Sequence, residues 1–391
     1  MTGETLSSTH PLLPPTTEDD RVSWLRLLRS RRVGIVTFYR LLAEHGSAAA
    51  ALDALPEVAA RAGVPNYVPC PISVAEGEMR AGARAGATLV FRGTPAYPAM
   101  LAQTADAPPM FWTLGDTAVL RRPMIALVGA RNASSLGTRM TRSLAAALGQ
   151  AGFTIVSGLA RGIDAAAHLA SLDTGTVAVQ AGGVDVIYPS ENAGLARDMV
   201  ERGGLRLSEQ PIGLQPLSRH FPVRNRIISG LSQAVVVVEA AARSGSLITA
   251  RAALDQGREV LAVPGHPFDA RSGGCNMLIR DGARLVRGAD DVAEALGLAL
   301  PLLRAPAAAV NSPDPVPGRV EAPARPPNPA LRKIHALHRQ ILDRLSPSPL
   351  AEDQLIRDLG VQARDVAPAL TDLELDGKVM RQPGGMLTRI V

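Results

Sequence analysis

The sequence predicts a doubly wound α/β domain between a small helical domain and a C-terminal winged helix, and three observations carry this prediction. Short β-branched runs alternate with helical stretches from about Thr88 to Gly297, which is the pattern of strands joined by crossover helices. Residues 24–84 instead have apolar residues at helical spacing. Beyond residue 330, three helical stretches precede a hairpin, which is a winged-helix layout.

The N-terminal part divides into a tail and a bundle of short helices. Residues 1–20 are polar and contain prolines, so we expect a disordered tail there. Gly34, Gly46 and Gly63 then separate stretches of helical periodicity. The order of helix, Gly-Ile-Val and helix resembles sterile-alpha-motif or helix-hairpin-helix modules, and we predict a sterile-alpha-motif-like domain over residues 21–87. A packing module without a ligand of its own is an equally good interpretation.

Six candidate strands mark the central α/β domain, which we place over residues 88–298. They are Met124–Val128, Thr154–Ser157, Thr176–Gln180, Leu205–Ser208, Ala234–Val238 and Glu259–Val263. Several are continuous apolar runs, as expected of parallel strands that are buried on both faces. Open sheets of this kind bind ligands at the carboxyl ends of their strands, so the turns after these strands are the candidate site.

A proline-rich linker and a winged helix follow. Nine prolines between Pro301 and Pro329, without periodicity, predict an extended, semi-rigid linker over residues 299–330. We place the winged helix over residues 331–391. Its predicted helices are Leu331–Leu345, Glu352–Leu359 and Ala363–Leu375, and its predicted strands are Val379–Arg381 and Met386–Ile390.

Composition narrows the class of protein. The 391 residues include 41 basic ones, all arginines except Lys333 and Lys378, and the net charge is +5. This favours a polyanionic partner, although an arginine-rich composition can also be a genomic habit. Cys70 and Cys275 lie far apart without metal-ligand spacing, which argues against a disulfide framework and a zinc site. The sequence has neither a signal-peptide pattern nor an apolar run of about 18 residues, so we expect a cytoplasmic protein. We also expect the protein to have no cofactor.

The first turn of the α/β domain offers a place for an anion. Gly129 ends a strand, and Ser134 or Ser135 caps the next helix, whose free amides and dipole suit an anion. The turn lacks the G-x-G-x-x-G spacing, and Ser157 stands where an NAD-binding protein has an acidic residue, so NAD has weak support. Arg131 in this turn is either a phosphate contact or an ordinary surface arginine.

The second turn, over residues 157–168, leads into a helix that begins at Asp164 and carries His168 four residues on. An acid and a histidine at this spacing share one face and can do acid-base chemistry. We favour the structural interpretation, in which Asp164 binds neighbouring amides or an arginine and His168 is packed or hydrogen bonded. The turn contributes four candidate site residues: Ser157, Gly158, Arg161 and Gly162.

The third and fourth segments add a basic cluster and a second amide nest. Arg219, Arg224 and Arg226 lie around Phe221, and no acidic residue occurs between Glu209 and Glu239. Uncompensated guanidinium groups beside an aromatic ring are typical of a site for single-stranded nucleic acid, whereas a solvated basic face is the ordinary alternative. Further on, the turn Ser244-Gly245-Ser246 follows a strand and begins a helix, which makes an amide nest for a phosphate.

Other features of the sequence argue against catalysis and against a DNA-reading winged helix. The sequence has no P-loop, HExxH, GxSxG or carboxylate array, and we predict that the protein is not an enzyme. A winged helix normally sends its third helix into the major groove. Here residues 363–376 carry Arg364 against four acids, Asp365, Asp372, Glu374 and Asp376. We therefore expect the winged helix not to be the main DNA reader.

The motifs of the α/β domain resemble those of the DNA-processing protein A (DprA, also Smf) family. The resemblance rests on VGAR (128–131), SGLARGIDAAAH (157–168), GGVDVIYP (182–189), FPVRNRIISGLS (221–232), SGSLITA (244–250) and NMLIRDGA (276–283), in this order. It implies an extended Rossmann fold that binds single-stranded DNA, protects incoming strands in natural transformation and loads RecA recombinase onto them. It also implies a homodimer through the α/β domain, and we choose the segment Cys275–Leu285 for the contact.

The resemblance further implies that these turns form one phosphate pocket. Carried over residue by residue, that pocket comprises Gly129, Arg131, Ser157, Gly158, Arg161, Asn225, Arg226, Ser244 and Gly245. We add Gly162, Phe221 and Arg224 from the turn and the basic cluster described above. Ala130 stands where many members of the family have serine, which removes one hydroxyl donor but leaves the backbone amides.

One enzymatic alternative stays open. The Ser-Gly-Ser-Leu-Ile-Thr turn after a Val-Val-Val-Glu strand is similar to that of nucleotide-hydrolysing Rossmann enzymes, which release a base from a nucleoside monophosphate. Glu239 would then stabilise an oxocarbenium ion. The glycine-rich P-G-G-x-G-T loop of those enzymes is absent from this sequence, so we rank this alternative below the binding of single-stranded DNA.

Overall fold

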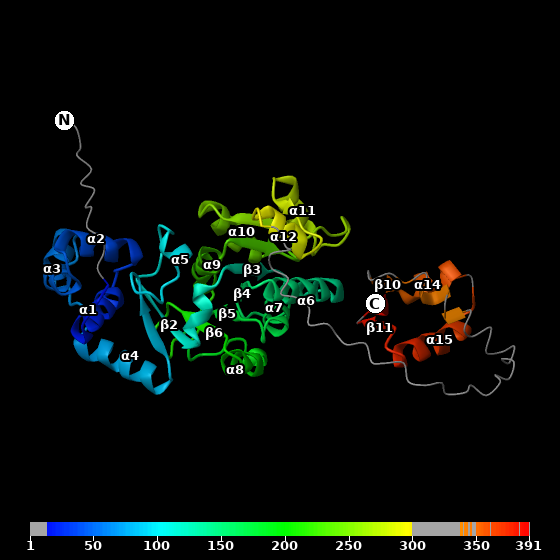
Figure 1. Cartoon of the computed structure of the whole chain (residues 1–391), viewed down its shortest axis with the longest axis horizontal. Helices are drawn as coiled ribbons and strands as arrows, with labels where there is room; N and C mark the ends of the chain where they lie inside the picture. Colours follow the sequence, from blue (N-terminus) through cyan, green and yellow to red (C-terminus); the bar gives the residue numbers. More distant parts are fainter. Residues whose placement is uncertain are drawn as a thin grey trace, which may run out of the picture. The chain divides into compact units, whose positions relative to one another are not determined.

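The computed structural model describes residues 14–298 and 337–390, apart from residues 339, 343, 344, 346–348, 360 and 383. Most of the predicted tail and the whole predicted linker lie outside the described residues. The chain divides between Ala305 and Pro306 into two compact units (Figure 1).

The first unit begins with four helices, α1 (Glu18–Arg29), α2 (Ile35–His45), α3 (Ala48–Arg61) and α4 (Ile72–Arg84). Fully buried side chains such as Leu25, Phe38 and Leu41 form their core. Helix α1 starts three residues before the predicted domain boundary at residue 21, within the expected tail. The reason is a capping box, in which Asp20 N–H donates to Thr17 Oγ1 (3.1 Å) and Thr17 N–H donates to the Asp20 carboxylate (3.2 Å).

The helical bundle shares its core with an antiparallel pair of strands, β1 (Thr88–Phe91) and β2 (Met110–Gly115). Trp24 of α1 packs edge-on against Phe91, with ring centroids 6.0 Å apart. Glu78 of α4 accepts hydrogen bonds from Arg29 (2.8 Å) and from the Trp112 indole (2.9 Å). Neither strand is among the six that the sequence predicts.

Within the described residues, the central sheet has nine strands in the order β1-β2-β6-β5-β4-β3-β7-β8-β9. Its parallel strands are β3 (Met124–Val128), β4 (Thr154–Ser157), β5 (Thr176–Val179), β6 (Leu205–Ser208), β7 (Ala234–Val237), β8 (Glu259–Ala262) and β9 (Arg284–Leu285). The six predicted strands are all present, each with its predicted start and an end within one residue. The strand order reverses between β3 and β7, because successive strands are added on one side of β3 up to β6 and on the other side from β7.

Helices cover both faces of this sheet (Figure 1). Side chains alternate along β3: Ile125 and Leu127 face one layer, while Ala126 and Val128 face the other. The first layer contains α6 (Ser135–Gln150), α7 (Ile163–Ala170), α8 (Ala193–Glu201) and α12 (Ala289–Ala295). The second contains α5 (Ala99–Ala102), α9 (His220–Leu231), α10 (Ser246–Asp255) and α11 (Gly273–Arg280). This is the doubly wound architecture that the sequence predicts.

The second unit has the winged-helix layout. Helices α14 (Glu352–Leu359) and α15 (Ala363–Leu375) match the predictions. Strand β12 (Met386–Arg389) pairs antiparallel with β11 (Val379–Gln382) and with the short β10 (Leu350–Ala351). Much of the predicted first helix, Leu331–Leu345, lies outside the described residues. In the part of the chain that the structure describes, no helix combines the length and the apolar character that a membrane span requires.

Candidate functional site

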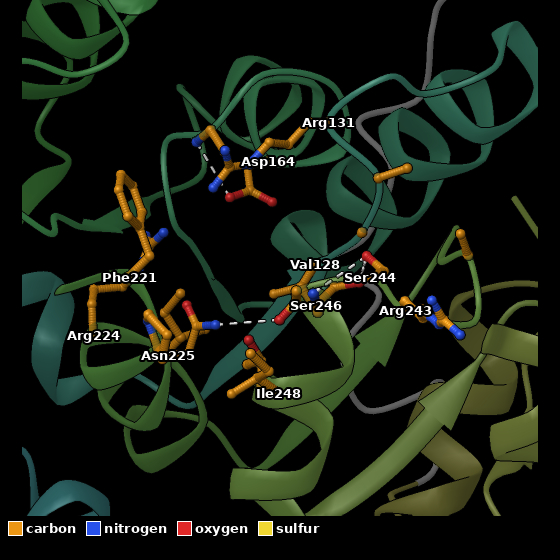
Figure 2. Close-up of a pocket in the computed structure, with 18 of the residues that line it drawn as sticks. Val128, Arg131, Asp164, Phe221, Arg224, Asn225, Arg243, Ser244, Ser246 and Ile248 are labelled. Atoms are coloured by element: carbon orange, nitrogen blue, oxygen red, sulfur yellow. Dashed lines mark hydrogen bonds between the residues drawn. The ribbon is translucent and has the colours of Figure 1, made fainter. Parts of the chain in front are cut away.

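A pocket of about 860 Å³ opens where β3 and β7 end (Figure 2). Residues after β3, residues after β7 and the facing sides of α9 and α10 line it. Because the strand order reverses between β3 and β7, helices on opposite faces lead away from the two strand ends and leave a crevice between them. Its polar and aromatic lining includes Arg131, Asn132, Tyr188, Phe221, Arg224, Asn225, Arg243, Ser244, Ser246 and Arg271.

Two arginines give the pocket its available positive charge. Arg131 and Arg243 are exposed, and neither forms an ion pair with another described residue. The Arg131 guanidinium lies over the Phe221 ring, 5.3 Å from its centroid, which is a cation–π contact. Arg271 instead pairs with Asp269 at 3.0 Å, so its charge is largely compensated. The electrostatics therefore favour an anion between Arg131 and Arg243.

The N-terminus of α10 lies in the same pocket as an amide nest. The Ser244 and Ser246 hydroxyls are 2.8 Å apart, and the Asn225 side chain donates to the Gly245 carbonyl at 3.4 Å (Figure 2). Among the described residues, the Gly245 N–H has no hydrogen-bond acceptor. An amide at the positive end of a helix, beside hydroxyls and Arg243, suits a phosphate oxygen. Ser244 and Gly245 thus lie where the sequence places them.

The predicted anion site at the N-terminus of α6 is wrong, because the protein's own Glu239 fills it. The Glu239 carboxylate accepts the Ser134 N–H at 2.9 Å and also binds the Ser134 hydroxyl. Ser134 is the N-cap and accepts the Gly137 N–H at 2.9 Å. Gly129 still lines the pocket, but the Ser134 and Gly137 amides at this helix N-terminus already have acceptors within the protein.

In the second turn, the structural interpretation of Asp164 and His168 is confirmed. Asp164 Oδ2 accepts the N–H groups of Gly158 (3.1 Å) and Ala160 (3.3 Å). His168 Nδ1 is 2.7 Å from the Thr176 hydroxyl. Burial lowers the pKa of His168 to about 3, so its ring is neutral at physiological pH. His168 is therefore buried and uncharged, whereas Asp164 lines the pocket with one carboxylate oxygen held by backbone amides.

Arg224 holds this turn against the sheet. Its guanidinium donates to the carbonyls of Gly158 (2.7 Å) and Val179 (2.6 Å). Burial lowers the pKa of Arg224 to about 10, and the nearby Asp164 carboxylate opposes that shift. The guanidinium is therefore still charged at neutral pH, and it forms part of the pocket's back wall.

Of the other predicted residues of the second turn, Ser157 and Gly162 determine the backbone conformation, and Arg161 provides an exposed cation. Ser157 is fully buried and donates to the Leu127 carbonyl at 2.6 Å. Gly162 has φ +73° and packs so closely against the Ala130 carbonyl that a side chain would collide with it. Arg161 is exposed and pairs with Glu191. It lines a neighbouring cavity of about 380 Å³, to which Gly158, Arg131 and Phe221 also contribute.

Arg226 lies outside both cavities, contrary to the prediction. It pairs with Glu209 and donates to the Asp106 carbonyl at 2.8 Å, with its side chain only 12% exposed. The reason is helical periodicity along α9. Phe221, Arg224, Asn225 and Ile228 form a stripe at positions i, i+3, i+4 and i+7 that faces the pocket. Position i+5 points away from that stripe, so Arg226 contacts the protein interior.

Sequence reasoning missed Tyr188 and Arg243. The Tyr188 ring lies 5.7 Å from that of Phe221, is half exposed and lines both cavities. Arg243 immediately precedes the Ser244 nest and lines the larger cavity. The sequence contained a signal for each residue. Tyr188 is one of few aromatic residues, which make up only 3% of the chain, and Arg243 directly precedes the predicted phosphate turn.

Comparison with known proteins identifies the relatives of this chain. A family model described as DNA recombination-mediator protein A matches residues 88–297. Models described as the DprA-like N-terminal HHH domain and the DprA winged helix domain match residues 18–81 and 322–385. The helical domain is therefore of the helix-hairpin-helix (HHH) kind, and the prediction of a sterile-alpha-motif-like domain is corrected.

Individual relatives agree with these matches. Protein Smf of Escherichia coli (strain K12) is 39% identical over 292 residues, which cover 74% of this chain and 74% of that protein. DNA processing protein DprA of Streptococcus pneumoniae is 46% identical over 198 residues, which cover 50% of this chain and 70% of that protein. An X-ray structure of DprA from Streptococcus pneumoniae aligns with a TM-score of 0.53 at 39% identity, covering 57% of this chain and 77% of that one. The chain therefore belongs to the DprA/Smf family of DNA-processing proteins.

Proposed function

We propose that the protein binds single-stranded DNA in the pocket between β3, β7, α9 and α10, and that it thereby protects incoming strands in natural transformation and loads RecA recombinase onto them. One observation carries the DNA part of this proposal. Two exposed arginines without an ion pair to a described residue, an amide nest and a pair of aromatic rings surround a single cavity. Membership of the DprA/Smf family supports the role in transformation.

The chemistry of the pocket suits a nucleic-acid backbone. A phosphate at the α10 nest meets the Gly245 N–H, the hydroxyls of Ser244 and Ser246, and the Arg243 guanidinium. A neighbouring phosphate meets Arg131. Since every one of these donors faces phosphate oxygens rather than base edges, binding is expected to tolerate any base sequence.

The aromatic pair favours a single strand over a duplex. Phe221 and Tyr188 line the cavity, so a base reaches them only when it is unstacked from its neighbours. Bases of a duplex are stacked inside it, whereas those of a single strand are free to stack on protein rings. The pocket therefore selects for the strandedness of the DNA and not for its sequence.

We further propose that the protein is not an enzyme. In the rival interpretation, Glu239 stabilises an oxocarbenium ion at a nucleotide sugar. Glu239 instead caps α6 and does not line the pocket. Asp164 is held by two backbone amides, and His168 is buried and neutral. These contacts support binding without hydrolysis.

The remaining proposals rest on family membership and on the sequence. They are a cytoplasmic homodimer and domains over residues 21–87, 88–298 and 331–391. Within the proposed contact segment, Cys275 is buried against the Val237 carbonyl, so an interface would use the later residues. Leu285 of the edge strand β9 is 44% exposed, which supports this end of the segment.

A titration tests the proposed function against its rival. Fluorescent oligothymidylate and, separately, thymidine monophosphate are added to the full-length protein at two salt concentrations. We expect the oligonucleotide to bind far more tightly than the mononucleotide, with an affinity that falls as salt rises. Mononucleotide binding of equal strength, or release of free base from it, contradicts the proposal.

A further inference from the structure

We propose that the turn with His266 and Phe268 is a second stacking platform for single-stranded DNA, beside the pocket. This inference rests on the proposed function, because the strand that fills the pocket is the one that continues over Arg271 onto the Phe268 ring. It adds a binding element that the motifs of the sequence did not indicate.

Phe268 differs from the other phenylalanines of the chain. The sequence contains six, of which Phe38, Phe91, Phe111 and Phe153 are buried in the core and Phe221 lines the pocket. Phe268 is 94% exposed. In a chain so poor in aromatic residues, a ring that contributes nothing to the core is available for a ligand.

The turn that presents this ring is braced by hydrogen bonds. Arg271 binds the Asp269 carboxylate through its backbone N–H (2.9 Å) and its guanidinium (3.0 Å). At the base of the turn, the Asn276 side chain binds both the N–H and the carbonyl of Gly265, at 3.2 and 3.0 Å. A ring on a braced turn loses little conformational entropy when a base stacks on it.

His266 makes the platform wider. Its ring centroid lies 5.6 Å from that of Phe268, with the planes 40° apart. His266 Nδ1 accepts the Phe268 N–H at 3.3 Å, which fixes the imidazole relative to the phenyl ring. The two rings form an aromatic surface at the tip of the turn.

The platform lies within reach of a strand in the pocket. Arg271 lines the pocket and follows Phe268 by three residues. Three residues span at most about 11 Å even when fully extended, so the ring lies within a few nucleotides of the pocket wall. Asp269 does not repel the backbone strongly, because Arg271 compensates its charge.

The surroundings of Phe268 favour nucleic acid over a protein partner. It is the only large apolar side chain of the turn over residues 264–272, whereas protein interfaces have a contiguous apolar centre. Single rings that alternate with guanidinium groups are instead typical of surfaces that bind single-stranded nucleic acid. Here Arg131, Phe221 and Arg271 all line the pocket, and Phe268 precedes Arg271 by three residues.

A length series tests this inference. We expect Phe268→Ala in the full chain to weaken binding of a long oligothymidylate about 5-fold or more, since one stacked base contributes about 1 to 3 kcal/mol. Its affinity for a trinucleotide that fills only the pocket should not change. Leu254→Ala is the matched control, because Leu254 is 60% exposed and lies at the far end of α10 from the nest.

A second variant reports on stacking directly. In Phe268→Trp, the two native tryptophans, Trp24 and Trp112, are buried, so the new indole dominates any change in emission on DNA binding. We expect long oligothymidylate, but not the trinucleotide, to quench this emission. The affinity for the long strand should equal that of the unmodified protein, because an aromatic ring is kept.

Three outcomes overturn the inference. If Phe268→Ala binds long strands with unchanged affinity while Arg131→Ala and Phe221→Ala weaken binding, Phe268 is not a stacking platform. The proposed function then still holds. If Phe268→Ala binds DNA normally but associates more weakly with purified RecA, the turn contacts protein instead. If Arg131→Ala and Phe221→Ala also have no effect, the proposed function itself fails.

Discussion

The Glu239 carboxylate, two residues beyond the end of β7, accepts the Ser134 N–H at 2.9 Å and so caps α6, which follows the neighbouring strand β3. Two helix N-termini adjoin the crevice between these strands, and this contact closes one of them. At the other, α10, no carboxylate of a described residue takes the place of a ligand. We therefore expect a ligand phosphate to bind at α10, beside Arg243.

Glu239→Gln should therefore lower stability rather than remove an activity. The substitution weakens charge-assisted hydrogen bonds at a helix N-terminus, and we expect a loss of about 1.5 to 3 kcal/mol in the free energy of unfolding. Urea denaturation measures it. Ser134→Ala, which removes the same cap, is the companion variant and should cost about 1 kcal/mol. Full stability in both variants contradicts the capping role.

Arg131→Ala and Arg243→Ala should each weaken binding of single-stranded DNA and reduce its dependence on salt. If each guanidinium contacts one phosphate, each substitution should flatten the slope of log affinity against log salt by about 0.7. The measurement is a fluorescence titration of oligothymidylate at several salt concentrations. Arg202→Ala is a control, since the Arg202 side chain is exposed and pairs with Asp173 at 2.9 Å, outside the pocket and the proposed dimer segment. Slopes unchanged in both pocket variants contradict the placement of the phosphates.

Arg226→Ala should instead destabilise the protein while leaving the salt slope intact. It leaves the Glu209 carboxylate, only 12% exposed, without its cation, and breaking a buried pair costs about 3 to 5 kcal/mol. Denaturation measures the loss, and the oligothymidylate titration measures the slope. A flattened slope with normal stability means that Arg226 contacts DNA after all.

The pH dependence of this variant follows from Glu209. Burial raises the pKa of Glu209 in the folded protein, and Arg226 opposes that rise, so the pKa is higher still without Arg226. A folded-state pKa above the unfolded one means that the folded state binds more protons, and stability falls as pH rises through that interval. The stability deficit of Arg226→Ala should therefore be smallest in acid, where Glu209 is protonated, and should grow toward neutral pH. A deficit independent of pH argues against this origin.

Phe221→Ala should lower affinity for single-stranded DNA without changing the salt slope, because a stacked base adds about 1 to 3 kcal/mol but no charge. Affinity should vary little among oligonucleotides of different base sequence. The comparison uses single strands and a duplex of the same length under the same salt. Equal affinity for the duplex and the single strand counts against a pocket that takes unstacked bases.

Removal of the winged helix by truncation near Pro315 should leave most of the affinity for single-stranded DNA. Two acids at the C-terminal end of α15 pair with cations of the wing: Glu374 lies 3.0 Å from Arg381, and the C-cap Asp376 lies 2.8 Å from Lys378. These cations are therefore partly neutralised and have little charge left for a backbone. A loss of about 2 kcal/mol or more, over tenfold in affinity, would show that this domain supplies primary contacts.

The sequence by itself determined six of the seven parallel strands of the sheet, all except the two-residue strand β9. Runs such as Ala234–Val238 are apolar throughout because both faces of the strand are buried, and this signal is contained within five consecutive residues. The antiparallel strands were missed for the opposite reason. Strand β2 pairs with β6, about ninety residues away, and its aromatic side chains pack partly on the helical bundle. The sequence of residues 110–115 alone does not indicate that this segment pairs with β6.

The sequence also determined which turns approach the site, since parallel strands of one sheet end at one edge. Only the tertiary structure decided which groups in those turns are free. Glu239 and Asp164 reach the amides of two turns through side-chain contacts that depend on the packed sheet, and the direction of α9 sends Arg224 to the pocket and Arg226 to Glu209. Motifs specify residues and spacing, whereas the satisfaction of each polar group depends on partners brought together by the fold.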